Sequence, residues 1–387
     1  MYYKKSSTAV LLLAGVFTAL LYSCKDDKDV TPSLNVTLSV TKDTTVNVGD
    51  SIIIEAIADN NVPVTHSWKI NDTLTITGWR LAYKPGVAAK YVIKYEGSRA
   101  NGTKVNKELT VDVVPKVRPV TGTSSKYISV VYEYFPAPGQ FVNESIGTPE
   151  GAQKIIGGTS NMVHLGAFGG YVIFGFDHSI VNKSGADLAI YGNPLKTPTE
   201  WSEPGIVVVS QDINGNGIPD DPWYELAGSQ YNAEGTIKNY KVTYYNPKAV
   251  ANVIWKDNRG NSDTVLINRF HNHQYYPLFA ANQDSITFEG TVMSNTFGLM
   301  PGSSVYINAA FAWGYADNWS TDATKDPYET NMYNSLDIAW AVDKDGKAVT
   351  LNAIDFVKVY TGQNCKGNTL LGEVSTEVRG AADLNME

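Results

Sequence analysis

The stretch QDINGNGIPDD, residues 211–221, contains closely spaced residues of the types that bind calcium. Calcium takes hard oxygen ligands, and Asp and Asn side chains separated by glycines can place several around one ion. The spacing follows an EF-hand loop, except that the twelfth position is Trp223 instead of Glu. The alternative is a hairpin tip in which Asn-Gly pairs supply positive φ. The candidate calcium ligands are Asp212, Asn214, Asn216, Asp220 and Asp221.

A second candidate metal site is the HxH pair formed by His271 and His273 in NRFHNHQYYP. On a strand, both rings would lie on one face, where they could bind zinc or another transition metal. Neither a third ligand nor a catalytic glutamate is evident nearby in the sequence. The favoured interpretation is therefore polar residues on a strand face beside aromatic packing.

The motifs of nucleophilic and nucleotide-dependent enzymes are missing. The sequence has no GxSxG, no P-loop, and no GxGxxG between a strand and a helix. We therefore expect a protein that is not an enzyme. A pair of carboxylates acting on a glycosidic bond stays open, because only their separation in space decides it. The carboxylates to inspect are Asp177, Asp187, Glu203 and Glu225.

Aromatic residues gather in the loop-like stretches 270–279, 311–319 and 326–335. Several are surrounded by Asp, Asn, Ser and Thr, without the alternating apolar pattern that would bury them. Exposed Tyr and Trp are typical of surfaces that bind flat or ring-bearing ligands, whereas the alternative is ordinary anchoring of loops. The candidate ligand-binding residues are His271, His273, Tyr275, Tyr276, Trp313, Tyr315, Trp319, Tyr328 and Tyr333.

The N-terminus predicts export and lipid anchoring. Residues 1–23 combine Lys4 and Lys5 with a short apolar run, which is typical of a secretory signal peptide. Leu-Tyr-Ser-Cys, ending at Cys24, resembles a bacterial lipobox, although its tyrosine is bulkier than usual. The following KDDKD resembles the surface-export signal of Bacteroidetes-type lipoproteins. We expect Cys24 to be lipidated and the protein to lie on the outer face of the outer membrane.

Charge and cysteine content exclude further classes. The formal net charge of −8 argues against nucleic-acid binding. Cys365 is the only other cysteine, so a lipidated Cys24 would leave no intrachain disulfide. The core must then be stabilised by burial alone or by a metal.

Alternating apolar and polar residues predict an all-β protein with two domains. After a charged tether at 24–34, residues 35–117 resemble an immunoglobulin-like or PKD-like sandwich with Trp68 in its core. A linker at 118–126 precedes a larger β-sandwich or jelly-roll-like domain, 127–387, with few short helices. The clearest helix is predicted at 148–158, with Thr148 as N-cap, Pro149 at N1 and Gly157-Gly158 as its stop.

Long segments of the second domain resemble a known family. EYFPAPGQFVNE, GGYVIFGFDHSIVNKSGADLAIYGNP, EPGIVVVSQDINGNGIPDDPWYELAGS and SLDIAWAVDKDGKAV are similar to Bacteroidetes surface lipoproteins, many with a PKD-like domain, that include BtuH-type cobalamin-binding proteins. The resemblance implies capture of cobalamin, or another corrinoid, and its transfer to a TonB-dependent outer-membrane transporter. The alternatives are a glycan-binding lipoprotein of a polysaccharide-uptake system, with calcium at 211–221, and a surface glycoside hydrolase.

Overall fold

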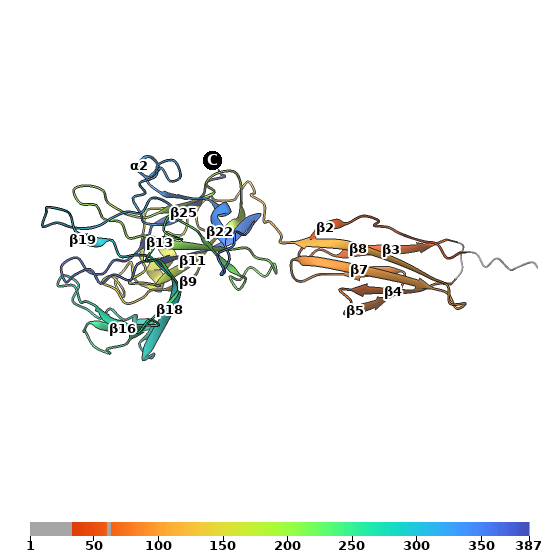
Figure 1. Ribbon diagram of the computed structural model, residues 1–387, viewed down its shortest axis with the longest axis horizontal. Coiled ribbons are helices and arrows are strands. Elements are labelled where there is room, and N and C mark those ends of the chain that lie inside the picture. Colours follow the sequence, from red (N-terminus) through yellow and green to blue (C-terminus); the bar gives the residue numbers. More distant parts are fainter. Residues whose placement is uncertain (1–32, 60–62, 387) are drawn as a thin grey trace, which may run out of the picture.

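The computed structural model describes residues 33–59 and 63–386, which form two β domains arranged end to end (Figure 1). The predicted signal peptide at 1–23, Cys24 and most of the tether at 24–34 lie outside the described residues. Within the described part of the chain, no helix is both long enough and apolar enough to cross a membrane.

The N-terminal domain is a sandwich of two sheets. One has the strand order β1-β3-β6 and the other β2-β8-β7-β4-β5, with β2 parallel to β8. Trp68 is fully buried between them, as predicted, and its indole N–H donates to the Gly78 carbonyl. The strands are β1 (Val36–Leu38), β2 (Thr44–Asn47), β3 (Ile52–Ala58), β4 (Thr65–Ile70), β5 (Leu74–Thr77), β6 (Arg80–Tyr83), β7 (Ala89–Ser98) and β8 (Lys104–Val114).

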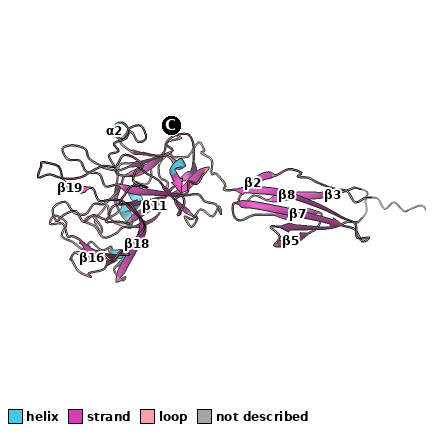
Figure 2. Cartoon of the chain, viewed as in Figure 1, coloured by secondary structure: helices cyan, strands magenta, loops and turns pink. Residues whose placement is uncertain are grey.

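The second domain is also built almost entirely of strands and loops (Figure 2). Its strands are β9 (Val130–Phe135), β10 (Val163–His164), β11 (Tyr171–Val181), β12 (Leu188–Tyr191), β13 (Gly205–Ser210), β14 (Trp223–Leu226), β15 (Ile237–Tyr245), β16 (Val253–Asp257), β17 (Ser262–Val265), β18 (Ser285–Val292), β19 (Phe297–Leu299), β20 (Tyr306–Asn308), β21 (Asn334–Leu336), β22 (Ala341–Val342), β23 (Ala353–Thr361), β24 (Glu377–Val378) and β25 (Gly380–Asp383). The all-β prediction is confirmed.

A central sheet of order β22-β14-β13-β23-β11-β9 separates two hydrophobic cores. Because side chains alternate along a strand, Val357 and Val359 enter one core while Tyr360 enters the other. The first core is closed by the sheet β21-β12-β25 and the second by the sheet β17-β16-β15-β18. The result is a three-layered β domain with its loops gathered around the layers.

Helices are few and short, as predicted. Thr148 caps α1 (Pro149–Ala152) by accepting from the Gly151 N–H at 3.0 Å, and Pro149 opens the helix. The chain continues as η1 (Gln153–Ile155), and Gly157 follows with φ 80°, so the helical segment ends slightly before the predicted position. The remaining helical turns are η2 (Leu278–Ala280), α2 (Tyr328–Asn331) and η3 (Ile338–Trp340).

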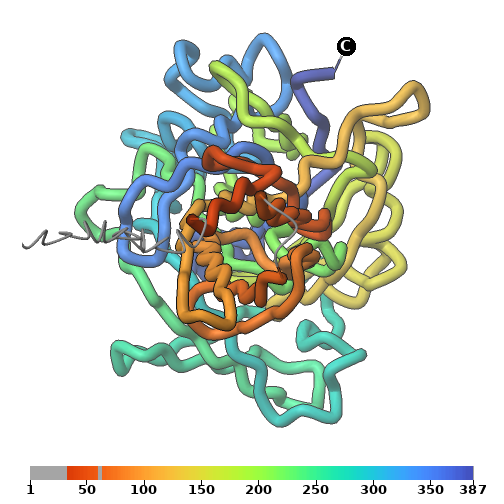
Figure 3. The backbone as a smooth tube through the Cα atoms, turned by 90° about the vertical axis from the view of Figure 1, so that its right-hand side faces the viewer, coloured from red at the N-terminus to blue at the C-terminus, as the bar shows by residue number. Residues whose placement is uncertain are grey.

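The predicted linker at 118–126 lies between β8 and β9 and is tied to the second domain. The Arg118 side chain donates to Asp355 Oδ1 at 3.2 Å, while the Asp212 N–H donates to Asp355 Oδ2 at 2.9 Å. The Ile213 carbonyl accepts from the Ala88 N–H of the N-terminal domain at 3.2 Å. The view along the long axis places the N-terminal domain over the middle of the second domain (Figure 3). Residues 211–221 therefore contribute to the joint between the domains.

Candidate functional site

A cavity of about 580 Å³ opens in the second domain. Its walls are mainly apolar, and include Phe141, Leu195, Trp201, Val305, Tyr306 and Leu370. Amide and carboxyl groups also line it, those of Gln140, Asn193, Glu203 and Glu377. An apolar cavity with a few convergent polar groups is the usual form of a small-molecule binding site.

Aromatic packing shapes one wall of this cavity. Phe297 stacks on Tyr306 with ring centroids 5.2 Å apart and an interplanar angle of 7°. Trp201 meets Phe297 edge to face at 6.0 Å. Two backbone hydrogen bonds between Leu195 and Trp201, at 2.7 and 2.8 Å, fix the loop that carries the indole. Tyr306 is 38% exposed, so part of this aromatic wall is accessible.

The β19–β20 hairpin that carries this wall lies at the end of the second domain away from the N-terminal domain (Figure 1). Val305 and Tyr306 of this hairpin line the cavity.

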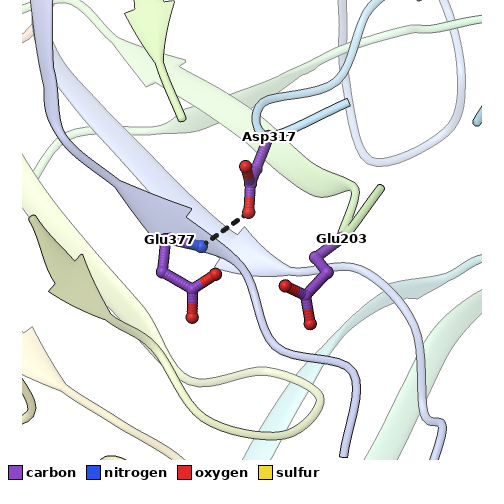
Figure 4. A group of neighbouring side chains, drawn as sticks. All are labelled: Glu203, Asp317 and Glu377. Carbon is purple, nitrogen blue, oxygen red and sulfur yellow. Dashed lines mark hydrogen bonds between the residues drawn. The ribbon is translucent and has the colours of Figure 1, made fainter. Parts of the chain in front are cut away.

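Three carboxyl groups meet at the polar side of the cavity. Glu203 precedes β13, Asp317 belongs to the loop before α2, and Glu377 opens β24. Figure 4 shows the three side chains reaching toward one another from these separate segments. One carboxylate oxygen from each lies within 4.8 Å of the others. Asp317 and Glu377 are buried, while Glu203 is partly exposed at the cavity wall.

Backbone hydrogen bonds hold these carboxyls in place. Asp317 Oδ2 accepts from the Glu377 N–H at 2.9 Å, and Oδ1 accepts from the Asn193 N–H at 2.7 Å. Glu203 Oε1 accepts from the Ser375 N–H at 2.9 Å. Gly192 packs directly against Asp317, where a Cβ atom would collide with the Asp317 side chain. Backbone groups therefore fix the positions of these carboxyls, and the backbone moves less than side chains would.

Two further ionisable side chains extend the cluster inward. His164 faces Glu377 across the β10–β24 pair, with Nδ1 2.7 Å from Glu377 Oε1. On the other side of the ring, Nε2 lies 3.4 Å from Glu373 Oε1. The side chains of His164 and Glu373 are fully buried. Among the residues that the structure describes, neither His164 Nε2 nor Glu373 Oε2 has a hydrogen-bond partner.

The electrostatics of the cluster are those of crowded acids. Burial raises the pKa of Asp317 to about 7. Burial, together with the neighbouring carboxyls, raises the pKa of Glu203 and of Glu377 well above the usual range. In the described part of the chain, the only ion pairs of Glu373 and Glu377 are with His164, and no Lys or Arg pairs with Glu203 or Asp317. The cluster would therefore gain from a bound cation.

A second cavity, of about 250 Å³, contains Glu225, one of the carboxylates singled out from the sequence. Here the acid is neutralised, since Lys238 Nζ lies 3.5 Å from Glu225 Oε1. The Thr291 hydroxyl also donates to Glu225 Oε2 at 2.6 Å. This carboxylate is satisfied by its own neighbours.

Four of the predicted ligand-binding tyrosines are core residues. Tyr275 and Tyr276 are 0% exposed, and Tyr315 and Tyr328 are 2% exposed. The expectation that they form a binding surface is wrong, because tertiary packing covers stretches that lack any apolar alternation. The Tyr315 hydroxyl, for example, accepts from the Gln230 N–H at 2.8 Å.

The other predicted ligand-binding aromatics are partly exposed but dispersed. Trp313 packs on Trp340 with Lys325 over its ring, Trp319 packs on Tyr328, and Tyr333 packs on Tyr191. None of the three lines the 580 Å³ cavity.

His271 and His273 lie in a loop, which corrects the predicted strand. Glu144 Oε1 bridges them, at 3.1 Å from His271 Nδ1 and 3.5 Å from His273 Nδ1. His271 also packs against Phe141, a residue of the cavity wall, with ring centroids 4.5 Å apart. Among the described residues, the pair is not part of a group that converges on a metal position.

The 211–221 stretch connects β13 to β14, which confirms the hairpin alternative. Gly215 and Gly217 have φ of 71° and 74°, as expected for Asn-Gly turns. Asp212 accepts from the Asn216 and Gly217 N–H groups, and Asp221 from the Ile213 N–H. The side-chain amides of Asn214 and Asn216 donate to Asp220. The loop is closed by its own hydrogen bonds, and calcium binding there stays a prediction.

Sequence reasoning singled out Glu203 as a carboxylate to inspect but missed Asp317 and Glu377. Asp317 lies in FAWGYADNW, a stretch noted only for its aromatics, and Glu377 lies near the C-terminus. The Glu203 N–H donates to the Asp317 carbonyl at 2.9 Å, a long-range contact that brings these segments together. No local spacing signals such a contact.

No family model matches the chain, and no curated protein matches it. Matches among solved structures include a quinonprotein alcohol dehydrogenase-like protein from Bacteroides thetaiotaomicron, with 12% identity, a TM-score of 0.20, and coverage of 65% of this chain and 52% of that one. This chain thus spans about half the length of that protein.

Another match is a structure of carbohydrate-binding modules from the β-sandwich superfamily, with 10% identity, a TM-score of 0.18, and coverage of 91% of this chain and 97% of that one. A third is SGBP-B of the Bacteroides ovatus mixed-linkage glucan utilization locus, in complex with a mixed-linkage heptasaccharide. It shows 12% identity, a TM-score of 0.19, and coverage of 71% of this chain and 74% of that one. At these TM-scores the matches carry no argument about function, and the resemblance to cobalamin-binding lipoproteins stays a prediction.

Proposed function

We propose that this chain is a surface lipoprotein that binds a glycan in the 580 Å³ cavity, without catalysing a reaction. The observation that carries the proposal is the combination, in one cavity, of an aromatic wall with acceptor groups. Trp201 and Tyr306 form that wall, while Glu203 and Glu377 supply acceptors on the polar side.

A sugar ring matches this combination chemically. Its two faces carry C–H groups, which pack on aromatic rings, and its edge carries hydroxyl groups that donate and accept hydrogen bonds. Carboxylates are strong acceptors for such hydroxyls. The side-chain amides of Gln140 and Asn193 at the cavity wall add donors and acceptors in the same space.

The arrangement of the domains also suits capture at a surface. In the sequence, the N-terminal sandwich lies between the predicted lipid anchor and the ligand-binding domain. The β19–β20 hairpin lies at the end of the second domain away from the sandwich (Figure 1). A ligand bound in the cavity would be held by the domain that is farther from the predicted anchor in the sequence. Its recipient would be an outer-membrane transporter of a polysaccharide-uptake system.

The corrinoid hypothesis takes second place. It relied on aromatic stretches at 270–279 and 311–335, in which Tyr275, Tyr276, Tyr315 and Tyr328 are buried. A corrinoid remains a useful competitor in the binding experiment, because it also offers apolar faces and hydrogen-bonding groups.

Glycoside hydrolysis is the third candidate function, favoured by the presence of Glu203 and Glu377 in one cavity. Their closest oxygens lie within 4.8 Å. Retaining glycosidases separate their two carboxyl groups by about 5–5.5 Å and inverting ones by about 6.5–9.5 Å, with the scissile bond between them. This distance is compatible with the retaining separation, so we choose binding over hydrolysis on the aromatic wall and not on the carboxyl spacing. New reducing ends after prolonged incubation with oligosaccharides would reverse that choice.

Calorimetric titration of residues 25–387 with a panel of oligosaccharides and with cyanocobalamin tests the proposal. Trp201→Ala should weaken glycan binding about five- to thirtyfold, because truncating an aromatic contact costs about 1–2 kcal/mol. Trp79→Ala is the control, since Trp79 is 54% exposed on the other domain. Equal glycan affinity in the two variants would show that the cavity is not the glycan-binding site. If the chain binds cyanocobalamin and only Trp201→Ala abolishes that binding, the ligand of the cavity is a corrinoid and not a glycan.

A further inference from the structure

We propose that Glu203, Asp317 and Glu377 bind a divalent cation, calcium, at the polar side of the cavity. The site is distinct from the 211–221 loop, where the sequence predicts calcium. The three side chains come from segments far apart in the sequence, and the fold brings them together (Figure 4).

The geometry suits one ion. A carboxylate oxygen from each residue lies within 4.8 Å of the others. Calcium binds oxygens at about 2.3–2.6 Å, so two ligands on opposite sides of the ion can be about 5 Å apart. A donor set made only of carboxylates favours a hard cation such as calcium over zinc, which prefers nitrogen and sulfur.

The charge of the cluster supports the same conclusion. Glu373 lies beside the three proposed ligands through His164, so four carboxyl groups share this region. Among the described residues, His164 is the only basic side chain that pairs with any of them. Buried carboxylates are costly unless they are paired, protonated or bound to a metal. A dication compensates two of these charges at once.

A separate observation concerns hydrogen bonding. The side chains of His164 and Glu373 are fully buried, yet among the described residues Glu373 Oε2 has no hydrogen-bond partner, and His164 Nε2 has only an ion-pair contact with Glu373 Oε1, 3.4 Å away. The same imidazole directs its Nδ1 at Glu377 Oε1, 2.7 Å away, so these groups adjoin the proposed ligands. Buried polar atoms without partners are rare in folded proteins and point to an absent ion or water. His164 would then orient a ligating carboxylate, as groups behind metal ligands commonly do.

The position of the ion relative to the cavity gives it a role. The backbone N–H groups of Asn193 and Glu377 donate to Asp317, while the Glu203 and Glu377 side chains line the cavity. Calcium takes about 6–8 oxygen ligands, whereas three carboxylates supply about three to six, depending on whether each gives one or two oxygens. The remaining positions would face the cavity and accept water or ligand hydroxyls. This last step rests on the proposed glycan-binding function, and the cation site itself does not.

The test is titration of metal-stripped residues 25–387 with calcium chloride alone, followed by calorimetry. We expect saturable binding that Glu203→Gln weakens at least tenfold. Glu225→Gln is the matched control, because Glu225 lines the other cavity and is paired with Lys238. Asp317→Asn is the second variant, with circular dichroism to confirm that it is folded. Absence of calcium binding by the unsubstituted chain, or equal affinity in Glu203→Gln and Glu225→Gln, would overturn the proposal.

A paired experiment separates this proposal from the proposed function. The best oligosaccharide of the panel is titrated in calcium and again in EDTA. Stronger glycan binding in calcium, lost in Glu203→Gln, supports the coordination of ligand hydroxyls. If calcium binds but no glycan does, the proposed cation site is retained and the proposed glycan-binding function is rejected. If glycan binding is unchanged by EDTA and calcium does not bind, the proposed cation site is rejected and the proposed glycan-binding function is retained.

Discussion

The 211–221 loop and the Glu203–Asp317–Glu377 cluster are both acidic, but the groups that surround their carboxylates differ. In the loop, Asp212 accepts from two backbone N–H groups, and exposed Asp220 accepts from two side-chain amides. In the cluster, the carboxyls face one another and lack a lysine or arginine in the described part of the chain. The loop satisfies its charge internally, whereas the cluster does not.

The comparison teaches that acid density is a weak guide to a metal site. In turns, the side-chain oxygens of closely spaced Asp and Asn residues can accept hydrogen bonds from nearby N–H groups. These oxygens are then less available to bind a metal ion. The carboxyls of the cluster also accept from backbone N–H groups, but only from segments distant in sequence, and the three acids still face one another. The loop is therefore assigned to holding the domain joint, and the cluster to binding.

The largest expected effect comes from the residue that attaches the loop to the central sheet. Asp355 is 2% exposed and accepts from the Arg118 side chain, the Ser179 hydroxyl and the Asp212 N–H. Asp355→Ala should lower the free energy of unfolding of the second domain by about 3 kcal/mol, because three donors lose their acceptor. Urea unfolding measures the change.

Asp345→Ala is the control for this substitution, since Asp345 is exposed and pairs only with its neighbour Lys344 among described residues. Its effect should stay below about 0.5 kcal/mol. Calcium affinity of folded Asp355→Ala should match that of the unsubstituted chain. A large fall in affinity would mean that the loop and the cluster are coupled, which contradicts the comparison.

The fold class followed from local patterns in the sequence. Alternation along segments such as SIIIEAIA predicted strands, and Thr148-Pro149 predicted the start of α1, because caps and alternation depend on neighbouring residues. The third layer, β17-β16-β15-β18, was not anticipated. Which face of a strand meets which sheet depends on long-range pairing, and a single sequence does not display it.

The candidate site was mostly beyond local patterns. Glu203 was noted as a carboxylate to inspect, but its partners Asp317 and Glu377 depend on the Glu203–Asp317 backbone contact and the β10–β24 pair. The aromatic stretches misled for a related reason. Tyr275 and Tyr315 lie in stretches without regular apolar alternation, yet they are buried because distant segments cover them.

An intermediate effect is expected inside the loop itself. Asp212 is 8% exposed, and its oxygens accept from the Asn216 N–H at 3.1 Å and the Gly217 N–H at 2.9 Å. Asp212→Ala should cost about 1–2 kcal/mol of unfolding free energy, the range for buried donors left without an acceptor. The loss should be equal in calcium and in EDTA, as measured by paired urea titrations. A loss that appears only in calcium would show that the loop binds the ion.

The smallest expected effect gives the sharpest contrast between the two regions. Asp220 is exposed, and its bonds to the Asn214 and Asn216 amides are open to water, so Asp220→Ala should change unfolding free energy by less than about 0.5 kcal/mol. Calcium affinity should stay within about twofold of the unsubstituted chain, because Asp220 has no part in the cluster. If calorimetry instead shows a tenfold loss in Asp220→Ala and none in Glu203→Gln, calcium belongs to the joint between the domains. The cluster would then have to balance its charge with protons, since no lysine or arginine among the described residues pairs with it.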